Sequence, residues 1–278
     1  MIEIPSEFNY IEIYLTLRCN LECSYCVNKY GALERHRVEL CGDEWLTRIN
    51  RTNFNKLPLT IGGGEPTLHP EFYYIINNIR TDIQVDLLTN LHFDVKEFAK
   101  KIRAKKFNRN PNPAYKSIRV SYHALTMNPE ELIDKVKFLQ DKDFRIGIFG
   151  INHPEHMEQN IAMSELARVK NIYFFIKDFL GYYENKLFGY YKYKDALDSI
   201  PKPIRCRTHE LLVAPGGNIY RCHYDLYAKQ GALGKFGYDK FIFKYRNCQY
   251  FGMCNPCDVK IKSNRFLQMG SCNMEIEE

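Results

Sequence analysis

The chain has 278 residues, of which 45% are hydrophobic, and it carries a formal net charge of +6 and ten cysteines. A chain of this length can bury one substantial core, or one core and a small appendage. Its longest apolar runs, such as residues 172–176, are far shorter than the roughly 20 residues that span a bilayer. The N-terminus lacks the basic-then-apolar pattern of a signal peptide. We therefore expect a cytoplasmic protein with no membrane span. Its modest positive charge is compatible with an anionic ligand and does not indicate nucleic acid.

Short β-rich runs alternate with helical patterns from residue 8 to about residue 180, which is typical of a parallel sheet built from strand-helix units. The run Asn128-Pro129-Glu130-Glu131 predicts a helix start, because it combines a capping side chain, an early proline and acids near the positive end of the helix dipole. Pro70-Glu71 predicts a second start of the same kind. Six units favour an α/β fold with a partial (β/α)6 barrel. The predicted strands are residues 10–17, 57–62, 83–89, 117–122, 144–149 and 172–176.

The C-terminal part of the chain differs in composition, because six of the ten cysteines fall between residues 206 and 272. We expect a barrel over residues 1–180, a linker over 181–205 and a small cysteine-rich module over 206–278. Clustered cysteines in a long, apparently unsecreted chain favour metal binding over a disulfide framework.

A first group of thiols follows the first predicted strand, where Cys19, Cys23 and Cys26 enter a loop. Spacings of three and two residues suit an iron-sulfur cubane. Three cysteines leave one of four irons free for a ligand that is not protein, as in metal sites that keep one open position. A zinc site that lacks a ligand, or three unrelated thiols, are the alternatives.

The pattern Cys-x3-Cys-x2-Cys, with the aromatic Tyr25 before its last cysteine, resembles the signature of the radical S-adenosylmethionine (radical SAM) superfamily. The resemblance implies that Cys19, Cys23 and Cys26 hold a [4Fe-4S] cluster whose open iron binds the methionine part of S-adenosylmethionine. It places Tyr25 near the adenine. It also implies reductive cleavage of that cofactor to a 5′-deoxyadenosyl radical, with a reducing partner such as flavodoxin or ferredoxin.

A glycine-rich turn, Gly62-Gly63-Gly64-Glu65, directly follows the second predicted strand. Glycines permit positive φ and let the backbone come close to a ligand, although a plain tight turn is the alternative. The turn resembles the Gly-Gly-Glu-Pro motif of the same family, which implies binding of the cofactor's amino group. The charge of Glu65 suits that ammonium.

Weaker candidates lie at the ends of later strands, which meet at the active face of a parallel barrel. By resemblance, Asn90 and Ser121 are expected to contact the ribose or carboxylate of the cofactor. His123 is a candidate catalytic residue that passes protons or holds substrate, with a purely structural histidine as the alternative.

A second group of cysteines resembles the twitch and SPASM modules of the superfamily. One cysteine, a Gly-x4-Cys element and a Cys-x2-Cys pair imply a second, auxiliary [4Fe-4S] cluster held by Cys206, Cys222, Cys254 and Cys257. Either Cys248 or Cys272 could replace one of these four. A structural zinc is the alternative. Cys41 lies outside both groups and is predicted to be a buried or helix-flanking thiol.

The expected reaction is hydrogen-atom abstraction from a small polar metabolite, such as a sugar, aminocyclitol or nucleotide derivative, with net oxidation or epimerisation. Maturation of a ribosomal peptide is the first alternative, although only about nine residues precede the first predicted strand, so no peptide-clasping domain is expected there. A non-catalytic iron-sulfur or zinc scaffold is the second alternative. The turn at Gly62 argues against it, since a scaffold needs no site for a cofactor ammonium.

Overall fold

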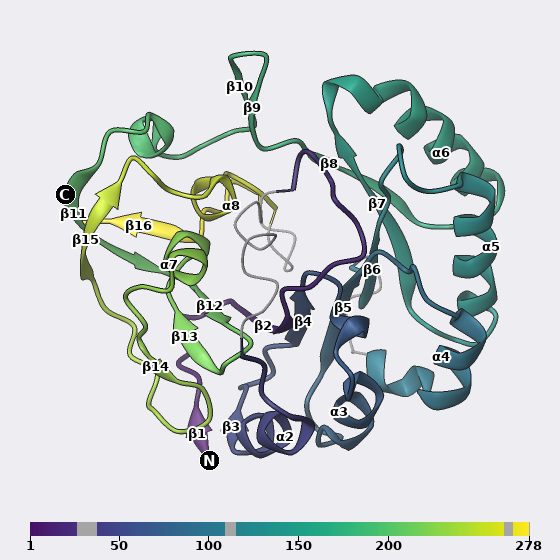
Figure 1. Cartoon of the computed structure of the whole chain (residues 1–278), viewed down its shortest axis with the longest axis horizontal. Helices are drawn as coiled ribbons and strands as arrows, with labels where there is room; N and C mark the ends of the chain where they lie inside the picture. Colours follow the sequence, from purple (N-terminus) through teal and green to yellow (C-terminus); the bar gives the residue numbers. More distant parts are fainter. Residues whose placement is uncertain (27–37, 109–114, 264–268, 278) are drawn as a thin grey trace.

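The computed structural model describes residues 1–26, 38–108, 115–263 and 269–277. The fold is α/β, and its main feature is a mixed sheet of nine strands. Their order is β14-β13-β12-β2-β4-β5-β6-β7-β8. Figure 1 shows these strands curving around the middle of the molecule, with α2 to α6 outside them. Within the described part of the chain, no helix has the length and apolar character needed to cross a membrane.

All six predicted parallel strands are present, and each boundary lies within three residues of the prediction. Each strand pairs in parallel with the next one along the chain. The strands are β2 (Tyr10–Thr16), β4 (Leu59–Gly63), β5 (Val85–Thr89), β6 (Ile118–Ser121), β7 (Ile146–Asn152) and β8 (Phe174–Asp178).

Apolar and polar side chains alternate along several of these strands, so the sheet has an apolar outer face and a more polar inner face. Ile11, Ile13 and Leu15 of β2 belong to the main hydrophobic core, together with apolar residues of the helices. Because side chains alternate along a strand, Glu12 points to the opposite face. The helices are α2 (Gly42–Asn50), α3 (Phe72–Asn78), α4 (Val95–Lys101), α5 (Pro129–Gln140) and α6 (Met157–Val169).

The cysteine-rich part of the chain shares the main sheet. Its strand β12 (Glu210–Val213) pairs in parallel with β2, and β13 (Asn218–Tyr220) and β14 (Gly234–Lys235) continue the sheet beyond it. The domain boundary at residue 206 remains a prediction. The main sheet contains strands from both sides of it.

A separate three-stranded sheet, in the order β15-β11-β16, carries much of the remaining C-terminal chain. Its strands are β11 (Lys202–Thr208), β15 (Arg246–Phe251) and β16 (Met274–Ile276). The shorter elements are β1 (Ile2–Glu3), β3 (Thr52–Asn53), β9 (Gly181–Tyr183), β10 (Lys186–Phe188), α7 (His223–Ala228), α8 (Pro256–Val259), and the 3-10 turns η1 (Pro66–Leu68), η2 (Ala104–Phe107), η3 (Pro154–His156) and η4 (Lys194–Leu197). The predicted linker therefore contains β9, β10 and η4.

The two predicted helix starts have different outcomes. Asn128 caps α5 as expected, because its Oδ1 accepts a hydrogen bond from the Glu131 amide at 3.0 Å. The prediction for Pro70-Glu71 was wrong about the cap. Helix α3 begins at Phe72 without a side-chain cap, and Glu71 instead accepts a hydrogen bond from the Gly42 amide at 2.7 Å, at the start of α2. The sequence could not reveal this hydrogen bond, because Gly42 and Glu71 lie far apart along the chain.

Replacing Asn128 with alanine is expected to lower the free energy of unfolding by about 1 kcal/mol, because the Glu131 amide loses its acceptor. Chemical denaturation would measure the change. Asn128→Ser is the matched control, since a serine at this position can still cap the helix. Equal losses in both variants would contradict a capping role.

Candidate functional site

The loop after β2 brings three half-buried thiols together. The amide of Cys26 donates to the Cys23 carbonyl at 3.1 Å, and Cys19 Sγ accepts a hydrogen bond from the Leu21 amide at 3.4 Å. Burial, and then the charges of Cys26 and Cys19, raise the pKa of Cys23 to about 12. Thiolates that raise each other's pKa in this way are stabilised by a bound cation. The donor set therefore fits an iron-sulfur cluster that three cysteines hold.

The glycine turn after β4 is held against the chain that leads into this loop. The Gly64 amide donates to the Thr16 carbonyl at 3.0 Å, and the Glu65 amide donates to the Arg18 carbonyl at 2.8 Å. A Cβ atom added at Gly63 or Gly64 would overlap these two carbonyl oxygens. Gly63 also has a φ of 127°, a region that L side chains rarely adopt. The glycines are required because two backbone segments approach each other beside Cys19.

The side chain of Glu65 is buried and accepts several hydrogen bonds. The Asn90 amide donates at 2.7 Å, the Thr89 hydroxyl at 2.9 Å and the Thr67 hydroxyl at 2.7 Å. Burial raises the pKa of Glu65, and these donors oppose that shift. The carboxylate therefore fastens the turn after β4 to the end of β5. Its predicted contact with the cofactor ammonium stays a prediction.

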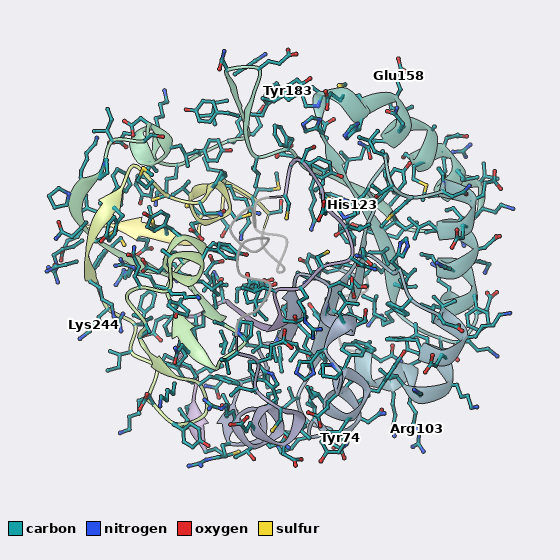
Figure 2. The ribbon with its side chains drawn as sticks, viewed as in Figure 1. Tyr74, Arg103, His123, Glu158, Tyr183 and Lys244 are labelled. Carbon is teal, nitrogen blue, oxygen red and sulfur yellow. The ribbon has the colours of Figure 1, made fainter. Side chains whose placement is uncertain are left out.

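His123 lies just after β6 and contacts the cysteine loop. Its Nδ1 is 2.8 Å from the Tyr25 hydroxyl and 3.2 Å from Cys23 Sγ, and the two rings stack with centroids 5.8 Å apart. Burial lowers the pKa of His123 to about 4. Figure 2 shows the residue toward the middle of the molecule. This contact supports a role in positioning the loop; catalysis by His123 stays a prediction.

Asn90 and Ser121 lie at the same edge of the sheet as the cysteine loop. The Asn90 side-chain amide donates to Asn20 Oδ1 at 2.7 Å, next to Cys19. Ser121 ends β6 and is in register with Phe149 of β7. The structure therefore brings the predicted cofactor residues of four segments together at the C-terminal ends of the strands.

Sequence reasoning missed two histidines beside Tyr25. The rings of His153 and His156 lie 5.4 Å and 5.8 Å from the Tyr25 ring, and both histidines are buried. The signal was available in the run His153-Pro154-Glu155-His156, which begins a few residues after the fifth predicted strand and directly after β7.

The C-terminal cysteines form a different group from the one predicted. Four of them, Cys206, Cys222, Cys248 and Cys254, line one cavity. Cys257 lies elsewhere, with its Sγ 3.9 Å from the Lys260 ammonium, and Cys272 contacts the Val259 carbonyl at 3.5 Å. Three members of the predicted set thus line this cavity together with Cys248, a predicted substitute, and the choice of ligands stays a prediction.

The surroundings of this cavity suit several thiolates. Arg221 lines it and is held by Asp225 at 2.6 Å and by the Asn247 carbonyl at 3.0 Å. Burial alone would lower the pKa of Arg221, but Cys206 and other acidic neighbours raise it overall. A hydrogen bond from Cys206 lowers the pKa of Cys248 to about 6. The donor set therefore fits a cationic cluster or metal.

A buried ion pair ties two cysteine segments together. His223 follows Cys222, Asp258 follows Cys257, and the His223 Nδ1 atom lies 2.6 Å from Asp258 Oδ1. Although burial opposes its charge, the Asp258 carboxylate raises the pKa of His223 to about 10. The His223–Asp258 ion pair thus links α7 to α8.

Cys41 is the N-cap residue of α2 and is exposed. The prediction of a helix-flanking thiol is confirmed, and that of a buried one is wrong.

The fold and the three-thiol loop are those of an iron-sulfur protein with a parallel α/β sheet. Residues 13–164 match the family described as the Radical SAM superfamily. The chain therefore belongs to the radical SAM superfamily, whose members use S-adenosylmethionine and a [4Fe-4S] cluster.

Several curated relatives carry the name GTP 3′,8-cyclase. The protein of Campylobacter jejuni subsp. doylei is 26% identical over 176 residues, which is 61% of this chain and 50% of the relative. The protein of Nautilia profundicola is 33% identical over 104 residues, 35% of this chain and 32% of the relative. The chain thus spans about half, or less, of the length of these relatives.

Solved structures share the fold at low sequence identity. SuiB of Streptococcus suis, bound to its precursor peptide SuiA, has a TM-score of 0.57 and 16% identity, and the match covers 81% of this chain and 62% of that one. A structure of anSMEcpe with bound AdoMet has a TM-score of 0.57 and 15% identity. The match covers 83% of this chain and 79% of that one.

Proposed function

We propose that this radical SAM enzyme removes a hydrogen atom from a small polar metabolite that carries an anionic group, with net oxidation or epimerisation as the outcome. One observation carries the proposal: the glycine turn is hydrogen-bonded, through the Gly64 and Glu65 amides, to the strand exit that leads into Cys19. The two segments expected to hold the cofactor and the cluster thereby form one site.

Cys19, Cys23 and Cys26 would hold the cluster, and the turn from Gly62 to Gly64 would bind the amino group of S-adenosylmethionine. Tyr25 would lie against the adenine, while Asn90 and Ser121 would contact the ribose or carboxylate. When bound, the cluster and S-adenosylmethionine supply a 5′-deoxyadenosyl radical that removes a hydrogen atom from the substrate. A flavodoxin or ferredoxin would provide the electron. The inner face of the sheet orients the substrate and limits the access of water.

The test is anaerobic incubation of iron-reconstituted protein with S-adenosylmethionine and dithionite. The expected product is 5′-deoxyadenosine, and its formation should rise when the correct metabolite is added. Absence of 5′-deoxyadenosine from protein with full iron content would overturn the proposal.

A nucleotide reaction is the second candidate, because curated relatives named GTP 3′,8-cyclase are similar to this chain over 176 and 104 residues. Incubation with GTP under the same conditions distinguishes the two. Formation of a 3′,8-cyclised nucleotide would favour this candidate, whereas GTP recovered unchanged beside 5′-deoxyadenosine would favour another polar substrate.

We also propose that an auxiliary [4Fe-4S] cluster occupies the C-terminal cavity, with Cys206, Cys222, Cys248 and Cys254 as its ligands. The support is that these four thiols line one cavity beside Arg221, whereas Cys257 does not. Four cysteine ligands leave no open iron, which favours electron transfer or a structural role over direct binding of substrate.

Replacing Cys248 with serine is expected to lower the iron content from about eight to about four per chain, since one cubane loses a ligand. Cys257→Ser is the matched control and is expected to keep about eight. Iron and sulfide analysis with Mössbauer spectra measures both. Loss of iron in Cys257→Ser but not in Cys248→Ser would make Cys257 the fourth ligand in place of Cys248. Zinc in place of the second cubane would indicate a structural site.

A further inference from the structure

Two histidines and a glutamate meet directly after β7. This strand ends at Asn152, His153 is the N-cap residue of the 3-10 turn η3, and Glu155 and His156 lie in that turn. One ring nitrogen of each histidine and one carboxylate oxygen of Glu155 lie within 4.8 Å of one another. Imidazole nitrogens and carboxylate oxygens are common ligands of divalent transition metals. The three side chains therefore have the chemistry and the proximity of a metal site.

The short turn explains why both imidazoles lie on one side. In a 3-10 turn, side chains three residues apart eclipse each other. The rings of His153 and His156 accordingly stack, with centroids 4.9 Å apart and an interplanar angle of 27°. Pro154 favours the turn, because its ring fixes φ at a helical value. The local sequence thus places two nitrogen ligands side by side.

His156 requires a partner that its protein neighbours do not provide. The residue is only 3% exposed. Both of its ring nitrogens are buried, and neither has a hydrogen-bond partner among the residues that the structure describes. A neutral imidazole has one donor and one acceptor nitrogen, and burying either without a partner costs free energy. Packing against Tyr25 alone leaves that cost unchanged, whereas a metal ion takes the lone pair of the acceptor nitrogen.

The carboxylate of Glu155 is oriented by a residue of another segment. The Tyr183 hydroxyl on β9 donates to Glu155 Oε1 at 2.9 Å, while Oε2 lies 3.7 Å from His153 Nδ1. Because zinc binds nitrogen and oxygen ligands at about 2.0–2.2 Å, one ion can contact two atoms that are 3.7 Å apart. The Glu155 amide also donates to His153 Nδ1 at 3.3 Å, and a bound ion would replace this long hydrogen bond. Outer hydrogen bonds such as that of Tyr183 hold ligands in position in metal sites.

This group of side chains borders the cysteine loop but contains none of its thiols. The Tyr25 ring lies 5.4 Å from the His153 ring and 5.8 Å from the His156 ring. The Tyr25 hydroxyl in turn lies 2.8 Å from His123 Nδ1. An ion that fixes the two histidines would therefore also fix the surface against which Tyr25 packs.

We propose that His153, Glu155 and His156 bind a divalent transition-metal ion, separate from the iron-sulfur clusters. Two imidazoles and one carboxylate are the donor set of some catalytic zinc sites and of non-haem iron(II) sites. Three protein ligands leave at least one position of the ion for water or for an oxygen atom of a bound molecule. The inference goes beyond the proposed function and does not depend on it, since the ion needs neither S-adenosylmethionine nor a radical.

The test is anaerobic equilibrium dialysis of the iron-reconstituted protein against zinc, followed by metal analysis and zinc K-edge X-ray absorption. Wild-type protein is expected to bind about one zinc ion per chain with nitrogen and oxygen neighbours at about 2.0–2.1 Å. Zinc held by thiols would instead have sulfur neighbours at about 2.3 Å. The ligand distances thus separate this site from zinc bound to the cysteines.

Two variants change the ligands and keep the surrounding contacts. His156→Phe keeps an aromatic ring beside Tyr25 and is expected to lose this zinc. Glu155→Gln keeps an acceptor for the Tyr183 hydroxyl and is expected to weaken zinc binding at least about tenfold. Because Glu155 is exposed, this variant tests the site even if His156→Phe does not fold. His92→Phe is the matched control, since His92 is an exposed histidine outside the group, and it should bind zinc like wild type.

Absence of zinc with nitrogen and oxygen neighbours from wild-type protein would overturn the inference. Equal zinc binding by wild type, Glu155→Gln and His156→Phe would identify adventitious zinc only, and would overturn it as well. These measurements do not use 5′-deoxyadenosine, so failure of the metal site and failure of the proposed function are separately visible.

Discussion

A Cys23→Ala variant is expected to lose the [4Fe-4S] cluster of the N-terminal loop and to form no 5′-deoxyadenosine. Cys23 is the middle thiol of the three, and it contacts His123 at 3.2 Å. Removing it leaves two thiols for a cubane that needs three protein ligands. Because the cofactor requires the cluster, activity should fall to the background of protein without iron.

Iron and sulfide content, Mössbauer spectra and 5′-deoxyadenosine formation measure this result. Iron should fall by about four per chain, and the iron of the proposed C-terminal cluster should be kept. Cys41→Ala is the matched control, because Cys41 is an exposed thiol at the start of α2. Full iron content and activity in Cys23→Ala would contradict the assignment of the loop.

A Gly63→Ala variant is expected to weaken S-adenosylmethionine binding by more than tenfold while the cluster is kept. The new Cβ would overlap the Thr16 carbonyl oxygen, and φ of 127° is strained for alanine. Such strain costs about 1 to 3 kcal/mol. The turn would move away from the exit of β2, and the amino-group site would be displaced from the cysteine loop.

Equilibrium binding of S-adenosylmethionine to the reconstituted protein, together with thermal unfolding, measures this effect. Gly216→Ala is the matched control, since its nearest contact, the Val38 carbonyl oxygen at 3.6 Å, leaves room for a methyl group. Unchanged affinity in Gly63→Ala would show that the turn does not contribute to the cofactor site.

The grouping of the C-terminal cysteines shows where sequence patterns reach their limit. The Cys-x2-Cys spacing favoured Cys254 and Cys257 as a pair. In the structure, Cys248 on β15 lies beside β11, where it is in register with Ile204, two residues before Cys206. Asn255 begins α8 by accepting from the Cys257 amide at 2.9 Å, and Cys257 then lies near Lys260. Strand pairing, which connects distant segments, brings Cys248 to the cavity that Cys206 also lines.

The sequence by itself determined the parallel strand-helix order, the three-thiol loop after β2 and the glycine turn after β4, because these depend on local alternation and on short spacings. The tertiary structure decided which residues meet: Glu71 with α2, His123 and the two histidines with Tyr25, and Cys248 with Cys206. The reason is physical. These contacts depend on strand register and on helix packing between segments far apart in the chain, and one sequence contains no direct signal for either.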